Sequence, residues 1–121
     1  MTRKDLRAIP LLISDILQAA REIADYAAVE RDVFLADRMR QRAVIQCFEV
    51  IGEATRKLPA DFRARHAGLP WRYMAAFRDK LIHDYFEVDL TLVYNTARRE
   101  IPVLIPLLEQ LDSVSDDGPH S

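Results

Sequence analysis

Apolar residues recur at three- and four-residue steps along most of the chain, which is the spacing of one face of a helix. The first series predicts a helix over residues 8–28, with Pro10 in the first turn, where its missing N–H costs nothing. A second series predicts a long helix over 37–58. Residues 58–70 lack such a series and predict a loop with at most one short helical turn. The pattern therefore favours helices and indicates no strand.

The second half of the chain predicts two more helices. The first covers about 71–86 and is expected to bury Trp71, Met74, Phe77 and Leu81, with Ile82 at the margin. Asp89 is a good N-cap for the last helix, because its carboxylate can accept from the free N–H groups of the first turn. Pro102 and Pro106 each remove a backbone hydrogen bond from that helix, so we expect a kink or a break near 98–102. The predicted fold class is all-α, an up-and-down four-helix bundle whose last helix is kinked at the two prolines.

Length and composition favour one small domain. A chain of 121 residues can bury one hydrophobic core, so we expect a single domain over 1–112, followed by a polar, disordered tail over 113–121. The first residues are charged, and the apolar run after them is short and carries Asp15, which argues against a signal peptide and a membrane span. We therefore expect a cytoplasmic protein. Cys47 is the only cysteine, so neither a disulfide within the chain nor a zinc site is expected.

Charge is unevenly distributed along the chain. Residues 31–80 hold 11 basic and 6 acidic side chains, a balance of +5, whereas residues 81–121 hold 2 basic and 8 acidic ones, a balance of −6. The middle of the chain therefore predicts a positive surface that attracts phosphates, and residues 38–42 are its densest part. The alternative is that these arginines only form the polar faces of helices.

One span, residues 78–85, combines side chains suited to catalysis. Asp79 and His83 lie four residues apart and share a helix face, so the carboxylate can orient the imidazole. Arg78 precedes His83 by five residues, about 140° round the helix, so only its long side chain can reach the same point. An imidazole that moves a proton and a guanidinium that stabilises phosphate charge suffice for metal-independent cleavage of RNA. The alternative is a solvated helix face with local ion pairs.

The number of histidines in this span bears on oligomeric state. Activating a nucleophile and protonating a leaving group are best done by two groups, and the span has only His83, so a two-fold dimer would supply the second. No metal or cofactor is expected, because Glu49 and Glu53 lie one turn apart without a third ligand at suitable spacing. Trp71 and Tyr73 are interpreted as packing residues rather than platforms for stacking bases.

Three stretches resemble the HepT-like family of HEPN-domain proteins, the toxin half of HEPN/MNT toxin–antitoxin modules: "VIGEATRKLP", "GLPWRYMAAFRDKLIHDYFEVD" and "VYNTARREIPVLIPLL". The resemblance runs from about residue 10 to 110. Its defining element is an Arg, four residues, a His, one residue and a Tyr, which here are Arg78, His83 and Tyr85. It implies a four-helix HEPN fold that is usually dimeric, with the motifs of two subunits facing one another. The polar residue after the Arg is here Asp79, where Asn, Asp or His is common in the family.

The resemblance also implies a function. It is that of a metal-independent endoribonuclease toxin of a type VII-like system, with RNA as substrate and Arg78, Asp79 and His83 as the catalytic set. It implies a partner, an MNT-type nucleotidyltransferase antitoxin that neutralises the toxin by transferring AMP to Tyr85, and a homodimer or higher oligomer. Two alternatives remain open. The chain is a non-catalytic partner or substrate-binding subunit of a nucleotidyltransferase, or it is a plain helical dimerisation module.

Overall fold

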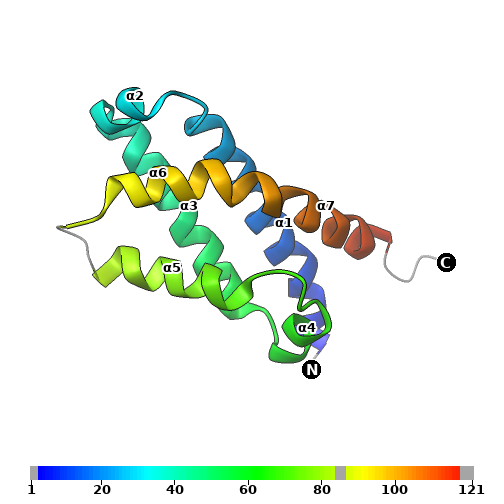
Figure 1. Ribbon diagram of the computed structural model, residues 1–121. Helices are drawn as coiled ribbons and strands as arrows, with labels where there is room; N and C mark the ends of the chain where they lie inside the picture. Colours follow the sequence, from blue (N-terminus) through cyan, green and yellow to red (C-terminus); the bar gives the residue numbers. More distant parts are fainter. Residues whose placement is uncertain (1–2, 84–86, 118–121) are drawn as a thin grey trace.

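The structure, a computed structural model, describes the backbone of residues 3–83 and 87–117 and the side chains of residues 8–83 and 87–112. These residues form seven helices and no strand (Figure 1). The helices are α1 (Arg3–Tyr26), α2 (Arg31–Ala36), α3 (Arg38–Lys57), α4 (Ala60–Arg65), α5 (Trp71–His83), α6 (Leu90–Arg99) and α7 (Ile101–Asp117). The prediction of an all-α bundle is confirmed, with α1, α3, α5 and the pair α6 and α7 as its long elements.

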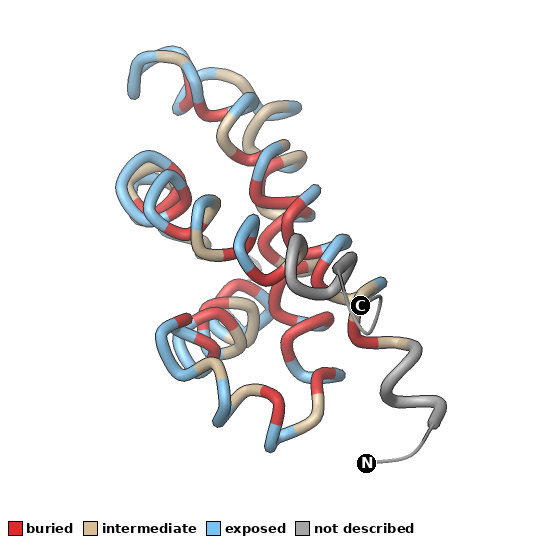
Figure 2. The backbone as a smooth tube through the Cα atoms, turned by 90° about the vertical axis from the view of Figure 1, so that its right-hand side faces the viewer, coloured by how far each residue is buried: buried red, intermediate tan, exposed pale blue. Residues whose placement is uncertain are grey.

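The hydrophobic core lies between α1, α3, α5, α6 and α7. The most extensive contacts between helices are those of α1 with α3, of α3 with α5 and of α1 with α7. Fully buried side chains on the facing sides include Ile13 and Ile23 of α1, Val44 of α3 and Leu108 of α7. Figure 2 shows the buried segments where the helices lie against one another and the exposed ones on the outside. The helical period in the sequence therefore identified the core-facing sides correctly.

Side-chain caps define where two of the helices begin. The Asp37 carboxylate accepts a hydrogen bond from the backbone N–H of Arg40 at 3.1 Å, at the start of α3. The Asp89 carboxylate accepts one from the N–H of Leu92 at 3.0 Å, at the start of α6, which confirms the predicted N-cap. Such caps satisfy backbone donors that have no partner within the helix.

The short helix α2 was not predicted from the pattern. It has six residues, too few for a periodic series to be recognised, and it is held by tertiary contacts. Its Phe34 is fully buried and packs against Tyr94 of α6, with ring centroids 5.3 Å apart. The Tyr94 hydroxyl also donates to the carbonyl of Val29 at 2.7 Å, just before α2. Contacts between distant parts of the chain therefore stabilise this turn as a helix.

The predicted interruption of the last helix is a break at Glu100. α6 ends at Arg99 and α7 begins at Ile101, with Pro102 in its first turn, where the missing N–H is tolerated. The two helices run on in nearly the same direction in Figure 1. Pro106 lies inside α7, which continues as a helix beyond it.

The end of α7 lies within the stretch that the sequence predicts as a tail. The helix continues to Asp117, whereas the sequence predicted disorder from residue 113. A helix that is already established can continue over polar residues such as Ser113 and Ser115, and the next residues in the sequence, Gly118 and Pro119, are typical of positions beyond a helix end. Residues 118–121 lie outside the described residues.

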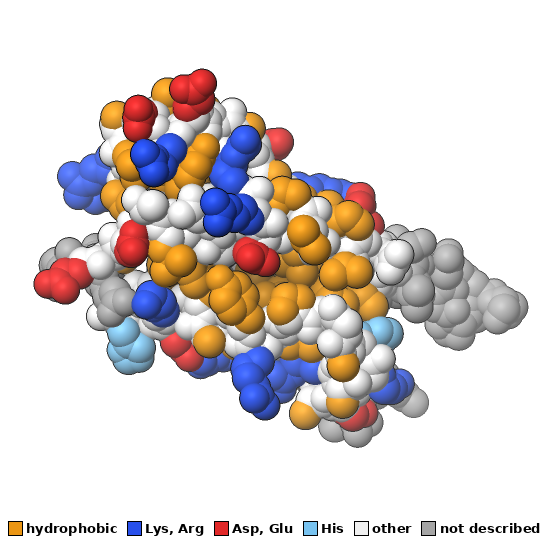
Figure 3. Space-filling model, in the orientation of Figure 1, with side chains coloured by type: hydrophobic (Ala, Val, Ile, Leu, Met, Phe, Trp, Pro, Cys, Tyr) orange, Lys and Arg blue, Asp and Glu red, His pale blue; other side chains and the backbone are white. Residues whose placement is uncertain are grey.

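An apolar groove separates α5 from α6 and α7. Its volume is about 310 Å³, and its walls include Tyr73 and Phe77 of α5 and Val103 and Leu107 of α7, over a floor of Phe48 and Ile51 from α3. Figure 3 shows this groove as a strip of hydrophobic side chains between α5 on one side and α6 and α7 on the other. Arg78, Asp79 and His83 do not line it. Within the described part of the chain, no helix is long and apolar enough to cross a membrane.

Candidate active site

Helix α5 presents Asp79 and His83 on the side away from its buried face and Arg78 at the edge of that face, against α3. The helix begins directly after Pro70, whose carbonyl accepts from the N–H of Met74 at 3.0 Å. Trp71, Met74, Phe77 and Leu81 are buried as predicted, whereas Ile82 is 42% exposed. Because the buried positions recur every three or four residues, the positions between them, including 78, 79 and 83, remain at the surface or at its edge.

Arg78 lies over Gly52 of α3. A Cβ atom added to Gly52 would lie 2.8 Å from Cδ and 2.9 Å from Cγ of Arg78, closer than side chains pack. Gly52 therefore lets α3 and α5 approach closely, because the aliphatic part of the Arg78 side chain packs where a Cβ at position 52 would be. The arginine side chain is only 24% exposed, and its Nε is buried with no hydrogen-bond partner among the described residues. The guanidinium is thus fixed near the surface with unused donor capacity, as an anion-binding group requires.

Asp79 lies between two arginines. Its carboxylate forms an ion pair with the guanidinium of Arg56, at the end of α3, and its Oδ1 lies 3.5 Å from Nη1 of Arg78. We expected this carboxylate to orient His83, but no hydrogen bond or ion pair joins the two in the described part of the chain. The contacts show Asp79 linking Arg56 to Arg78, and its effect on His83 stays a prediction.

His83 is the last residue of α5, and its side chain is exposed. It lies four residues after Asp79 on the same face of the helix, whereas Arg78 packs towards α3. The offset of about 140° between Arg78 and His83 is therefore present in the fold, and no hydrogen bond joins the two side chains in the described part of the chain. Tyr85, the predicted modified residue, lies outside the described residues.

A second groove lies beside this set of residues, and sequence reasoning missed it. We call it the α4–α5 groove; it has a volume of about 820 Å³ and is lined by Arg56 of α3, Arg63 of α4 and Arg72 and Asp79 of α5. The rest of its surface is made largely of small side chains, namely Ala60, Ala64, Ala67, Ala75 and Ala76. The three arginines belong to different helices and share no sequence motif. The helical period of α5 by itself could indicate only that Arg72 is on the surface, not that the three arginines meet.

The densest basic segment of the sequence, residues 38–42, does not contribute to the α4–α5 groove. Its Arg40 donates to the carbonyl of Tyr26 at 2.8 Å and lies 3.4 Å from the Asp37 carboxylate, so it joins α1 to the start of α3. Arg38 and Arg42 are exposed at the same end of α3. Residues 38–42 therefore lie apart from the α4–α5 groove, and their attraction for phosphates stays a prediction.

Among the described side chains, no group of three or more His, Cys, Asp or Glu residues is arranged to hold a metal ion. Glu53, one of the two glutamates with helical spacing, instead pairs with Lys57 at 3.6 Å.

The comparison with protein families decides how this site is to be interpreted. A family described as ribonuclease HepT-like matches residues 16–111, most of the chain, and the matched region contains Arg78, Asp79 and His83. The chain belongs to the ribonuclease HepT-like family. Within this HepT-like protein the family match covers α3 and α5, the two helices that form the contact between Gly52 and Arg78.

Curated relatives agree with this membership. A protein of Thermococcus cleftensis named "Probable ribonuclease HepT" is 41% identical over 100 residues, which cover 82% of this chain and 91% of the relative. Two proteins of Methanocaldococcus jannaschii, each named as a "Putative RNase", are 38% and 37% identical over 112 residues, which cover 92% of this chain and 90% of each relative. No solved structure gives a significant match to this fold.

Proposed function

We propose that this HepT-like chain is an endoribonuclease that cleaves RNA through the 2′-OH of the substrate, without a metal ion. The observation that carries the proposal is the placement of Arg78, fixed over Gly52 with an unpartnered Nε, on the helix that ends with the exposed His83. The family and the names of the relatives support ribonuclease activity as the general class.

The proposed reaction needs only groups that the chain carries. His83 accepts the proton of a 2′-OH, the 2′-oxygen attacks the adjacent phosphorus, and the bond from phosphorus to the 5′-oxygen breaks. Arg78 stabilises the negative charge that develops on the phosphate oxygens. The departing 5′-oxygen takes up a proton from a second imidazole, which a dimer supplies as the His83 of the other copy. The products are a 2′,3′-cyclic phosphate and a 5′-OH, and DNA is inert because it lacks the 2′-OH.

The first test compares RNA cleavage by wild type, His83→Ala and Arg78→Lys in the presence of a chelator. Both variants are expected to lose cleavage by at least about a hundredfold, because proton transfer and charge stabilisation each contribute factors of that order. Ile82→Ala is the matched control, since Ile82 is exposed on the same turn but carries no chemistry. Full cleavage by His83→Ala, or cleavage that stops when the chelator is added to wild type, contradicts the proposal.

The finer part of the proposal concerns regulation. The cleavage activity is that of a cytoplasmic toxin, and its antitoxin is an MNT-type nucleotidyltransferase that transfers AMP to Tyr85. The support is the Arg, His and Tyr motif of the sequence together with family membership. An added AMP group brings negative charge and bulk next to the place where an RNA phosphate meets Arg78, so modification would block substrate binding.

The test of this regulation uses the partner enzyme and ATP. We expect a mass increase of one AMP group on Tyr85 and a loss of RNA cleavage in parallel. Tyr85→Phe is the control, because it removes only the acceptor hydroxyl and is expected to remain toxic when the partner is present. An unchanged mass of the wild-type chain would reject the modification while leaving the ribonuclease assignment intact.

One observation favours a second function. Asp79 pairs with both Arg56 and Arg78. The proposed phosphate-binding residue, Arg78, therefore already has a negatively charged neighbour in the same chain. This arrangement suits a non-catalytic partner or substrate-binding subunit of a nucleotidyltransferase. Tight binding to that enzyme without growth arrest on expression of the chain alone would favour the second function over the first.

A further inference from the structure

The α4–α5 groove has a feature that the proposed catalytic residues do not explain. Three arginines line it, from three different helices, and Asp79 is the single acidic side chain among the residues that form its wall. Asp79 pairs with Arg56, whereas neither Arg63 nor Arg72 has an ion pair with a described residue. The groove therefore keeps an excess of positive charge.

The groove is continuous with the proposed site along one face of α5. Residues 72, 76, 79 and 83 follow one another at steps of four, three and four, so their side chains project from the same side of the helix. Arg72, Ala76 and Asp79 line the groove, and His83 lies one turn beyond. The distance along the helix axis from residue 72 to residue 83 is about 16 Å at the usual rise per residue, the length of a few nucleotides.

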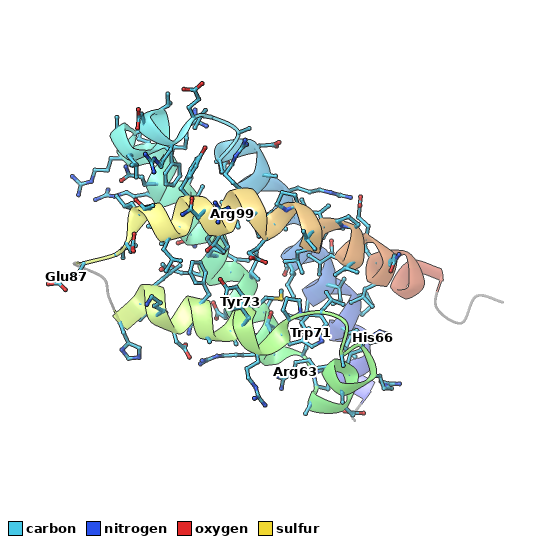
Figure 4. The ribbon with its side chains drawn as sticks, viewed as in Figure 1. Arg63, His66, Trp71, Tyr73, Glu87 and Arg99 are labelled. Carbon is cyan, nitrogen blue, oxygen red and sulfur yellow. The ribbon has the colours of Figure 1, made fainter. Side chains whose placement is uncertain are left out.

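The chemistry of the groove suits a sugar–phosphate backbone better than bases. Its wall consists largely of alanines, which let a polymer approach closely but offer no stacking surface. The one aromatic residue there, Trp71, is 6% exposed, and its indole N–H donates to the carbonyl of His66 at 2.9 Å, so it is not available to a base. Arg63, on α4, lies near Trp71 at the start of α5 (Figure 4). Its Nε is buried and has no partner among the described side chains.

We propose that the α4–α5 groove binds the backbone of single-stranded RNA and directs it towards the site on α5, with Arg56, Arg63 and Arg72 as phosphate contacts. Basic side chains gather along the edge of α5 that faces away from α6 and α7 (Figure 3). Their positive charge attracts the phosphates of the RNA along this edge. This inference rests on the proposed function, because it names where the substrate lies. It predicts binding with little sequence preference and with strong dependence on salt.

The test measures binding of a fluorescent single-stranded RNA to the full chain as a function of salt. A His83→Ala background prevents cleavage during the measurement. Adding Arg63→Ala and Arg72→Ala is expected to weaken binding about tenfold or more and to lower the slope of log affinity against log salt by about 1.4, because two phosphate contacts are lost and each contributes about 0.7 for a single strand. The matched control is Arg38→Ala with Arg42→Ala, which removes the same charge from the other end of α3.

A single Arg72→Glu variant tests whether weaker binding could come from misfolding, because Arg72 is exposed and its replacement leaves the core intact. It is expected to weaken RNA binding with an unchanged melting temperature. Binding by the groove variants that equals the parent, or a loss that the control pair shares, overturns the proposal. So does a groove pair that still binds RNA but no longer binds the nucleotidyltransferase, since the groove would then be a surface for that protein.

Cleavage by the wild-type chain, measured in parallel, distinguishes RNA binding by the groove from the proposed ribonuclease activity. RNA binding that depends on the groove without any cleavage by wild type would reject the proposed ribonuclease and leave the groove as an RNA-binding site. Cleavage by wild type together with unchanged binding by the groove variants would reject the groove alone.

Discussion

Position 52 has no side chain, and the stem of Arg78 occupies the space where one would be. Gly52→Ala is expected to destabilise the fold by about 1–3 kcal/mol, because the added methyl group overlaps Arg78 and forces α3 and α5 apart. It is also expected to reduce RNA cleavage by more than the change in stability explains, since the guanidinium is displaced. Chemical denaturation and cleavage kinetics measure the two effects.

Gly68 is the matched control for this substitution. A Cβ added there meets no atom within 4 Å, and the backbone has no positive φ in the described residues, so Gly68→Ala is expected to change neither stability nor cleavage. Equal effects of the two substitutions would show that the contact with Arg78 is not what matters at position 52.

Cys47 gives a prediction about pH and reactivity. Its thiol is buried and lies 3.5 Å from the Glu22 carboxylate. Burial raises the pKa of Cys47 to about 12 from 9.0, and the hydrogen bond and charge of Glu22 act in the same direction. The thiolate is the reactive form, so the native protein is expected to resist thiol reagents at neutral pH and to react on unfolding. Rapid labelling of the native chain at pH 7 would contradict this.

The raised pKa also fixes the sign of a stability change. Below pH 9.0 the thiol is protonated in both states and the effect on stability is constant. Above it the unfolded chain loses the proton first, so the free energy of unfolding is expected to fall by roughly 1 kcal/mol per pH unit up to the folded pKa. Cys47→Ala removes this dependence, which makes it the comparison for denaturation measured between pH 8 and pH 11.

At the scale of the element, the start of α6 depends on one side chain. Asp89→Ala removes the acceptor for the N–H of Leu92 and is expected to lower stability by about 1 kcal/mol. Glu87 is an exposed acid two residues earlier without a capping contact, so Glu87→Ala separates the loss of a cap from the loss of a charge. Denaturation midpoints that shift equally for both variants would reject the capping interpretation.

The elements show which information the sequence carries and which it lacks. The bounds of α3, the start of α5 and the break near Pro102 could be predicted, because helical period, caps and proline act over a few residues. Helix α2 could not, since Phe34 is buried by Tyr94, sixty residues further along the chain. The α4–α5 groove was missed for the same reason: Arg56, Arg63 and Arg72 meet only once α3, α4 and α5 are packed.

At the scale of the whole molecule, the separation of Arg78 from His83 predicts a site shared between two copies. Arg78→Ala and His83→Ala are each expected to be inactive alone. Mixing them under conditions of subunit exchange is expected to restore a small part of the wild-type cleavage, well below a quarter, because half of the dimers are mixed and each then brings one native Arg78 together with one native His83 but lacks the second imidazole. No recovery at all in a dimer confirmed by light scattering would contradict a site shared between two copies.

The apolar groove has a consequence for motion within the fold. Helix α5 packs extensively on α3 alone, and the groove separates it from α6 and α7, so it is held on one side. Local opening of α5 therefore breaks fewer contacts than opening of α1 or α3 does. Amide hydrogen exchange is expected to be faster in α5 than in those helices and to slow when RNA occupies the neighbouring α4–α5 groove. The helix that carries the proposed chemistry would then be ordered fully only by its own substrate.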